Sequence, residues 1–514
     1  MTSPALDQQE ITGTRNSPER PSSKREFWLV LAGLTFLYVI AVTIGNRRYV
    51  WFDELFTLDI GRSTSLQQVW YRVLRFDCNP PTVYLLSGWS MSIFGPTPFG
   101  LRFPSMVEFY FGSVAILLYV RRKVGIAFAA LAVLMLWAAG PTLYYAVEAR
   151  PYALLFLSFA CLLLSWDTAI RAQSRRLALF GVAISTLALA AAHVFAPFTL
   201  FAFVVAEILR FRRRRTPDYP LWAALLLPML AMLFYIPLIR LYGGLVFTDA
   251  SQASFRKIRI FFDGTLNAPI MFFALLAALL VSPEKRPGTK SPKLLPEEVS
   301  LFACLFLSPI LLNLVLMRRH GSFYDRYSIT SQAAILVALA LFLAYHVRLN
   351  RAAGYAASTV LVLFVLKTQV WHVIHYPVPK NAAFLASIQP NLPIVVGHGM
   401  VFMEMNHHEN AALLSRLYFL KDQQASMQYS HTNYFQDFEA PDVLKKAGFP
   451  ISGNVEPYSS FVGHHSQFLL LGDPTEWVYR KLRPGGASIL LIGDYSDAIP
   501  YRDTNLYLVT MPSP

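Results

Sequence analysis

The chain has 514 residues, of which 55% are hydrophobic and 15% are charged. Soluble globular proteins carry about 25% charged residues, so this composition excludes a single water-soluble domain, and the high hydrophobicity excludes intrinsic disorder. The formal net charge is +14, and the basic residues cluster between apolar runs. That pattern is typical of the cytoplasmic loops of membrane proteins, and we expect no nucleic-acid partner.

Eleven apolar runs are candidates for membrane-spanning helices, which need about 20 apolar residues. The first run has no small-residue cleavage site, so we expect an uncleaved anchor after a cytoplasmic tail of residues 1–26. Two runs are short and are the weakest of the set, namely Ile126–Trp137 and Pro269–Val281. The others are Phe27–Ile44, Phe103–Val120, Tyr152–Ile170, Leu177–Ala192, Phe195–Leu209, Leu221–Ile239, Val299–Met317, Ile329–His346 and Ala353–Val370.

The basic residues predict which way the chain crosses the membrane. If the N-terminus is inside, every inside segment is basic, as the positive-inside rule requires. An odd number of spans then places the C-terminal region outside. These inside segments are the tail with Lys24 and Arg25, Arg121–Lys123, Arg171–Arg176, Arg210–Arg215, Lys285–Lys293 and Arg348–Arg351.

Two of the outside segments are too large to be simple connectors. The loop of residues 45–102 holds an amphipathic stretch, Ser65–Leu74, and an apolar stretch, Pro80–Phe94, which we expect to lie as helices on the membrane surface. Residues 377–514 have a soluble composition, and their alternating patterns predict a small α/β domain. The predicted strands are Ile394–Gly397, Phe468–Leu471, Ser488–Ile492 and Leu506–Val509, and the predicted helices are Glu409–Tyr418, Asp442–Ala447 and Thr475–Leu482.

Two adjacent carboxylates, Asp53 and Glu54, follow the first span on the outside. Neighbouring like charges raise each other's pKa, and a carboxylate beside an apolar wall is suited to act as a general base. The alternative is a pair of solvated acids at a helix N-terminus. Asp77 and Asn79 precede a double proline that begins a helix, so they are rigidly placed polar groups.

Further polar residues occur at the outer ends of other predicted helices. Glu148 and Arg150 stand before the fourth span, where a mutual salt bridge is the alternative to a ligand contact. Cations beside tyrosines near Arg326 suit a phosphate group, with lipid headgroups as the alternative. The predicted catalytic residues are Asp53, Glu54 and Asp77, and the predicted substrate-binding residues are Asn79, Tyr84, Arg102, Glu148, Arg150, Tyr152, His193, Arg318, Arg326 and Tyr327.

Taken in order, four motifs resemble those of GT-C glycosyltransferases that use polyprenyl-phosphate sugars. They are the Asp53-Glu54 pair, the segment Asp77–Leu86, the segment Glu148–Leu154 and the pair Arg326-Tyr327. The resemblance is to the bacterial family 39-like members, which are relatives of protein mannosyltransferases and lipid A aminoarabinose transferases. One departure is Asn79, which stands where these proteins usually have His and cannot transfer a proton.

The resemblance implies a GT-C-like transmembrane catalytic domain over residues 27–376, in the inner membrane of a bacterium. It implies transfer of a sugar from a polyprenyl-phosphate donor to a glycolipid, polysaccharide or protein outside the cytoplasm. Asp53 would act on the acceptor, and Arg150, Arg326 and Arg318 would hold the leaving phosphate. This leaving group is already anionic, so no metal is required, although a divalent cation is compatible with the chemistry.

Two other kinds of function stay open at this point. A transporter or flippase of lipid-linked sugars would place its charges near the bilayer midplane, whereas these charges gather at one face. A non-catalytic relative that binds glycolipid through its soluble domain would have no need of the charged motifs. That domain also holds His398, Glu404, His407, His408 and Glu409, whose spacing matches no zinc signature.

Overall fold

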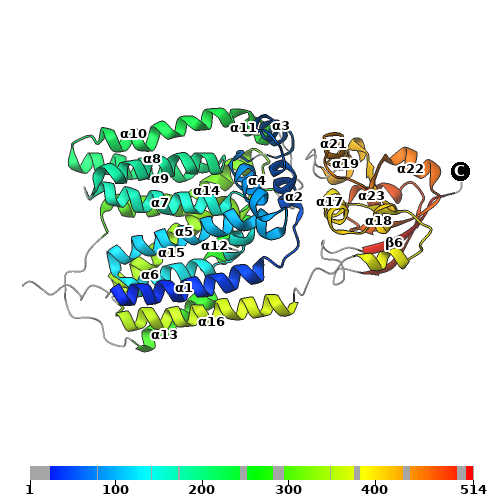
Figure 1. The fold of residues 1–514 in the computed structure, drawn as a ribbon. Helices are drawn as coiled ribbons and strands as arrows, with labels where there is room; N and C mark the ends of the chain where they lie inside the picture. Colours follow the sequence, from blue (N-terminus) through cyan, green and yellow to red (C-terminus); the bar gives the residue numbers. More distant parts are fainter. Residues whose placement is uncertain are drawn as a thin grey trace, which may run out of the picture.

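The computed structural model describes residues 24–77, 79–140, 142–171, 174–243, 252–281, 294–347, 349–375, 382–431, 440–494 and 505–512. Within these ranges the chain forms a bundle of roughly parallel helices, with an α/β domain beyond one end of the bundle (Figure 1). The predicted inside segment Lys285–Lys293 and most of the predicted tail lie outside the described residues.

All eleven predicted spans are helical. In the described part of the chain, nine helical stretches are long and apolar enough to cross a membrane. The bundle helices are α1 (Lys24–Gly45), α5 (Pro98–Val124), α6 (Ile126–Ala138), α7 (Tyr152–Ile170), α8 (Arg175–Ala192), α9 (Ala196–Arg214), α10 (Tyr219–Leu226) continued by η2 (Leu227–Tyr235) and α11 (Ile236–Gly243), α12 (Phe255–Leu266), α13 (Ala268–Val281), α14 (Pro296–Arg318), η3 (Asp325–Ser328), α15 (Ile329–Phe342) continued by η4 (Leu343–Val347), and α16 (Arg351–His375).

Helix α6 differs from the other predicted spans. It has 13 residues, and all of them are buried against α1, α5, α15 and α16. A helix of this length extends for about 20 Å, which is less than the roughly 30 Å of the hydrocarbon core. It is apolar on every side because protein surrounds it, so α6 is the central core helix of the bundle and covers only part of the membrane thickness.

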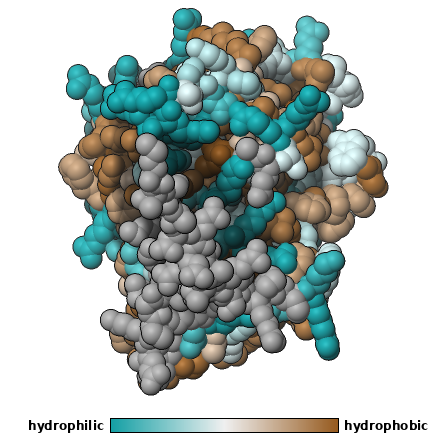
Figure 2. All heavy atoms as spheres, turned by 90° about the vertical axis from the view of Figure 1, so that its left-hand side faces the viewer, coloured by the Kyte–Doolittle hydropathy of each residue, from teal (hydrophilic) through white to brown (hydrophobic). Residues whose placement is uncertain are grey.

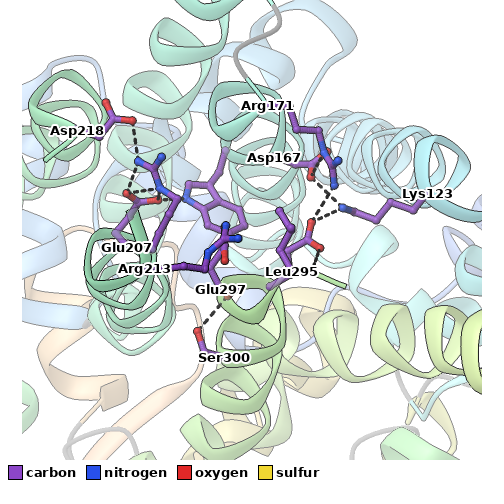
Figure 3. A network of polar contacts seen from close by, with 12 residues as sticks. Lys123, Asp167, Arg171, Glu207, Arg213, Asp218, Leu295, Glu297 and Ser300 are labelled. Atoms are coloured by element: carbon purple, nitrogen blue, oxygen red, sulfur yellow. Dashed lines mark hydrogen bonds and ion pairs between the residues drawn. The ribbon is translucent and has the colours of Figure 1, made fainter. Parts of the chain in front are cut away.

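The basic segments meet at the end of the bundle away from the α/β domain. Figure 2 shows hydrophilic side chains gathered over this face. In Figure 3, Lys123 of α5 lies beside Asp167 of α7, with a nitrogen–oxygen distance of 2.9 Å. Lys123 also pairs with Glu298 of α14, and Arg213 of α9 pairs with Glu297 at 2.5 Å. Each described inside segment therefore lies on the same side, as the charge pattern predicts.

Acidic side chains inside the helices neutralise part of this basic end. Glu207 of α9 accepts hydrogen bonds from Arg210 and from the indole of Trp166 at 2.8 Å. Arg210 also reaches Asp218 at 2.6 Å, ahead of α10. These acids lie at the end of the bundle where the sequence predicts only basic loops. A buried charge needs a partner of opposite charge, so the pairs hold α7, α9 and α10 together.

Three short helices lie in the loop at the opposite end, close to the α/β domain (Figure 1). They are α2 (Phe52–Gly61), α3 (Leu66–Phe76) and α4 (Thr82–Phe94). The predicted stretches correspond to α3 and α4, and α2 begins at the Asp53-Glu54 pair, where a helix N-terminus was the alternative interpretation of the sequence. Gly61 of α2 and Gly88 of α4 meet backbone to backbone, and a Cβ atom added to Gly88 would overlap the Gly61 carbonyl oxygen.

This close approach gives a test of the packing of α2. Gly88→Ala should lower the free energy of unfolding by about 1–3 kcal/mol, because the overlapping atom belongs to the backbone and cannot rotate away. The measurement is denaturation of the purified protein in micelles. Gly33→Ala, on the exposed face of α1 with no atom near its added Cβ, is the control and should not lower the stability, because Ala is the better helix former. Equal stability of the two variants would contradict this packing.

The C-terminal domain holds a six-stranded sheet in the order β3-β2-β1-β4-β6-β5. The first four strands in this order are parallel, and β6 is antiparallel to both β4 and β5. The strands are β1 (Ile394–Val396), β2 (Leu417–Lys421), β3 (Asn454–Pro457), β4 (Gln467–Gly472), β5 (Ser488–Asp494) and β6 (Asn505–Thr510), and the helices are η5 (Ala383–Ser387), α17 (Gly399–His408), α18 (Ala411–Leu414), α19 (Gln423–Ser430), α21 (Ala440–Lys446), α22 (Tyr458–His464) and α23 (Trp477–Leu482).

The prediction of an α/β fold is confirmed, but its details are incomplete. The four predicted strands form, whereas β2 and β3 were not predicted. The predicted helix Glu409–Tyr418 is wrong, because only Ala411–Leu414 is helical and β2 begins at Leu417. Short apolar runs cannot be assigned to strand or helix by periodicity alone.

Candidate functional site

The first carboxylate pair of the sequence is split by the structure, because Glu54 turns into the protein. Its two oxygens accept hydrogen bonds from Nε and NH2 of Arg102 at 2.8 and 2.6 Å. The backbone N–H of Ala149 donates a third hydrogen bond at 2.8 Å. Both charged side chains are fully buried, with 0% exposure. Glu54 and Arg102 therefore form a buried ion pair, which holds α2 against α5.

Arg102 also fixes the chain that leads into α2. Its NH1 and NH2 groups donate to the backbone carbonyls of Asn46, Arg48 and Tyr49, at 2.9 to 3.2 Å. Burial alone would raise the pKa of Glu54, but the charge and the hydrogen bonds of Arg102 outweigh burial and hold that pKa below its ordinary value. Glu54 stays ionised and acts as an anchor for this loop.

A second buried pair joins Asp77 to Arg150. NH1 of Arg150 donates to Oδ2 of Asp77 at 2.6 Å and to the backbone carbonyl of Asp53 at 3.2 Å. Nδ2 of Asn79 donates to the other Asp77 oxygen at 2.9 Å. Asn79, the residue that departs from the family pattern, thus supports Asp77 by a hydrogen bond that needs no titration. Tyr84 of α4 is also fully buried and acts electrostatically on Arg150.

The third pair, Asp53 with Arg326, is more accessible than the other two. NH2 of Arg326 lies 3.1 Å from Oδ2 of Asp53, and the two side chains are 18% and 14% exposed. The guanidinium also lies over the rings of Tyr324, Trp51 and Tyr152, with its carbon 4.6 to 5.5 Å from their centroids. Aromatic faces and a carboxylate thus orient this arginine, which is a geometry suited to binding a planar or tetrahedral anion.

Glu148 is a buried carboxylate beside these pairs. It is 1% exposed, and neither of its oxygens has a hydrogen-bond partner among the described residues. Burial raises the pKa of Glu148 to about 7, and the nearby charges of Arg326 and Arg48 offset only part of this effect. The raised pKa favours the protonated carboxyl, which can donate a hydrogen bond as well as accept one.

An aromatic wall completes the site. The ring of His193 packs at a tilt against Tyr327, with centroids 5.3 Å apart, and against Tyr152, with centroids 6.1 Å apart. Its Nδ1 accepts a hydrogen bond from the backbone N–H of Phe195. Burial, reinforced by the charges of Arg150 and Arg326, lowers the pKa of His193 to about 3. This shift favours the neutral ring near pH 7, and the ring packs against Tyr152 and Tyr327.

The remaining predicted binding residue, Arg318, does not join this group. It is exposed at the end of α14 and makes no hydrogen bond or ion pair in the described part of the chain. Arg326, eight positions later, turns into the site because η3 and α15 carry it there. Of the cations that the sequence predicts for this outer connector, Arg326 is the one that reaches the carboxylates.

Sequence reasoning missed Arg48. Its NH2 donates to the carbonyl of Val147 at 3.0 Å and lies 3.9 Å from Glu54, while its guanidinium stacks 3.4 Å from the Tyr144 centroid. A cavity of about 300 Å³ opens beside it, lined also by Arg47 and His407. A basic pair that follows a span on the outside breaks the positive-inside rule, which is the signal that could have identified it.

The C-terminal domain also reaches this region through α17. The backbone N–H of Phe52 donates to Glu404 at 2.7 Å, and Nε2 of His408 lies 2.7 Å from the Val50 carbonyl oxygen. The domain therefore contacts the residues that flank Trp51 and precede Asp53. Among the described residues, no three His, Cys, Asp or Glu side chains come together as a metal site would require.

Comparisons with known proteins give a structural likeness. No protein-family model matches the sequence, and no curated protein is significantly similar to it. The crystal structure of apo ArnT from Cupriavidus metallidurans is similar with a TM-score of 0.52 and 14% identity, covering 95% of this chain and 98% of that one. The structure of the same protein bound to undecaprenyl phosphate gives 0.51 and 14%, covering 96% and 99%. The chain therefore has a GT-C-like membrane fold.

Proposed function

We propose that this chain is a membrane glycosyltransferase that moves a sugar from a polyprenyl-phosphate donor to a glycan, lipid or protein acceptor. The ion pair between Asp53 and Arg326 is the observation that carries the proposal. Its partial exposure distinguishes it from the other two pairs, whose charges face each other inside the protein. The structural neighbour that was crystallised with undecaprenyl phosphate supports the class of donor.

The pair provides the two charges that such a transfer needs. A donor phosphate that binds Arg326 replaces Asp53 as the partner of its guanidinium. The Asp53 carboxylate is then available to the acceptor. Asp53 accepts the proton of the nucleophile, the nucleophile forms a bond with the anomeric carbon, and the bond from that carbon to the phosphate oxygen breaks. The electron pair leaves with the lipid phosphate, whose charge Arg326 stabilises.

The other charged residues have supporting roles in this proposal. Arg150, held by Asp77 and Asn79, donates to the Asp53 backbone and is the second positive charge near the phosphate. Glu148 is suited to hydrogen-bond a group of the donor, since its oxygens have no partner in the part of the chain that the structure describes. In this proposal Glu54 and Arg102 position α2, because the polar atoms of both side chains already have partners among the described residues, and they take no catalytic or binding role.

The location of the site follows from the charge pattern. The basic segments lie at one end of the bundle, which we assign to the cytoplasm, and the site and the C-terminal domain lie at the other. We therefore propose a multi-pass protein of the bacterial inner membrane with residues 377–514 outside the cytoplasm. Nothing in the reaction as written requires a metal, and a divalent cation would act on the phosphate if one takes part.

The alternative functions differ in where they need charge. A transporter would use charged groups near the middle of the membrane, whereas the site described above lies at the end of the bundle facing the C-terminal domain. A glycolipid-binding protein without activity would have no use for a base beside the phosphate group. The cleavage of the donor bond separates the proposed enzyme from both alternatives.

Variants of Arg326 test the donor-binding role. Arg326→Lys keeps the charge but loses the bidentate fork and the stacking on the rings, so the apparent KM for the donor should rise, and Arg326→Ala should raise it further. A lost charge-assisted hydrogen bond is worth about 1.5–3 kcal/mol, or on the order of 10- to 100-fold. The measurement is the initial rate against the concentration of polyprenyl-phosphate sugar.

Arg319→Ala is the matched control, since Arg319 is an exposed arginine of the same outer connector. It should leave the KM for the donor unchanged. If Arg326→Lys behaves like the parent, the arginine only anchors the chain to lipid headgroups, and Arg150 becomes the better candidate for the phosphate.

A further inference from the structure

The start of helix α2 is held by a helix of the C-terminal domain. Glu404 lies in α17, and its Oε1 accepts a hydrogen bond from the backbone N–H of Phe52 at 2.7 Å, within the protein interior. One turn further along α17, His408 contacts the carbonyl oxygen of Val50 at 2.7 Å and packs edge-on against the ring of Tyr49 at 5.7 Å. The two hydrogen bonds therefore hold the backbone on both sides of Trp51, at Val50 and at Phe52.

Glu404 acts as an N-cap for α2. The first amides of a helix have no partner within the helix, and a residue just before it usually satisfies one of them with its side chain. Trp51 occupies the N-cap position and makes no such hydrogen bond. A carboxylate from the other domain takes its place, and its negative charge also suits the positive end of the helix dipole.

The amide that Glu404 holds is one residue away from Asp53. The same short segment carries Trp51, whose ring faces the guanidinium of Arg326. Arg150 donates a hydrogen bond to the backbone carbonyl of Asp53 at 3.2 Å. The place of the Asp53 carboxylate therefore depends on two fixed points, one in the membrane bundle and one in the C-terminal domain.

We infer that Glu404 is a positioning residue that sets the conformation of residues 50–53, and that the C-terminal domain thereby forms part of the active site. This inference rests on the proposed function. A displacement of about 1 Å at a reacting group can reduce a rate by about 10²-fold, so loss of the cap acts on turnover more than on donor binding.

A purely architectural role makes a different prediction. The domain is also held on α3, where Phe449 packs edge-on against Phe76 at 5.3 Å and lies under Arg72. If Glu404 only docked the domain, weakening that second contact would have the same effect as removing Glu404. Phe449→Leu, away from Asp53, is therefore the matched control.

The experiment compares steady-state kinetics of the full-length Glu404→Ala, Glu404→Gln and Phe449→Leu variants. Glu404→Ala should lower kcat about 10- to 100-fold with little change in the KM for the donor. Glu404→Gln keeps an oxygen that accepts from Phe52 and should recover most of kcat, and Phe449→Leu should resemble the parent. A normal kcat for Glu404→Ala, or an equal loss in Phe449→Leu, would overturn the inference.

Hydrogen exchange of the segment around Phe52 is a second readout that needs no activity. Exchange at Phe52 should be faster in Glu404→Ala and close to that of the parent in Glu404→Gln. Unchanged exchange in the Ala variant would overturn the inference. If the parent protein transfers no sugar but exchange responds as expected, the proposed function fails while the positioning of this segment by Glu404 stands.

Discussion

Asp53→Asn should reduce sugar transfer by about 10²- to 10⁴-fold, which is the usual contribution of a well-placed general base. Asn has the same size and can still accept the hydrogen bond from Arg326, so the change removes the proton acceptor and its charge but keeps this contact. The measurement is kcat with saturating donor and acceptor. The variant should insert and unfold like the parent.

Asp59→Asn is the matched control for this prediction. Asp59 lies on the same helix, α2, and its carboxylate pairs with Arg62 at 3.7 Å, away from the Asp53–Arg326 pair. Its replacement should leave kcat close to that of the parent. Near-normal turnover of Asp53→Asn would move the base role elsewhere, and Glu148 would be the next candidate because Glu54 and Asp77 are occupied by arginines.

Arg102→Ala should lower the free energy of unfolding by about 3–5 kcal/mol, because it leaves the buried charge of Glu54 without its main partner. It also leaves three backbone carbonyls of residues 46–49 without their donor. Arg102→Lys should recover only part of this loss, since an ammonium cannot reproduce the bidentate fork. The measurement is reversible denaturation in mixed micelles.

The exposed pair of Arg259 with Asp263 on α12 provides the control for this effect. Its side chains are 83% and 68% exposed, so Arg259→Ala should change the stability by less than about 0.5 kcal/mol. If Arg102→Ala abolished transfer without loss of stability, Arg102 would bind substrate, as predicted from the sequence, and the anchoring role assigned to it would be incorrect.

Most helices of the bundle could be predicted, because each is a run of about 20 apolar residues, but α12, which carries Arg256, Lys257 and Arg259, was not predicted. Which charged residues pair with each other within the site could not be predicted. Glu54 pairs with Arg102 across 48 positions, and Glu404 caps Phe52 across 352 positions. A single sequence shows that such charges exist but not which of them meet, because the pairing is set by how the helices pack.

Residues that are close together in the sequence also have different surroundings in the structure, and the local backbone explains why. Asp53 and Glu54 are adjacent, but successive residues of a helix point in different directions, so one faces the accessible pair and the other the interior. Arg318 and Arg326 belong to the same basic connector, and the short helix η3 turns only the latter into the site. The composition of the connector shows that arginines gather there. The course of the backbone decides that Arg326 lies in the site and Arg318 does not.

Cleavage of the donor by purified protein bears directly on the proposed activity. Lipids are extracted from cells that lack the gene, and the extract is incubated in detergent with the parent protein and an acceptor fraction from the same cells. Mass spectrometry should find polyprenyl-phosphate sugar converted to sugar-free polyprenyl phosphate by the parent and by Asp59→Asn, and little conversion by Asp53→Asn. A flippase or a binding protein would leave the donor intact in detergent. Absence of conversion by the folded parent protein, or equal conversion by Asp53→Asn, would contradict a glycosyltransferase built on Asp53 and Arg326.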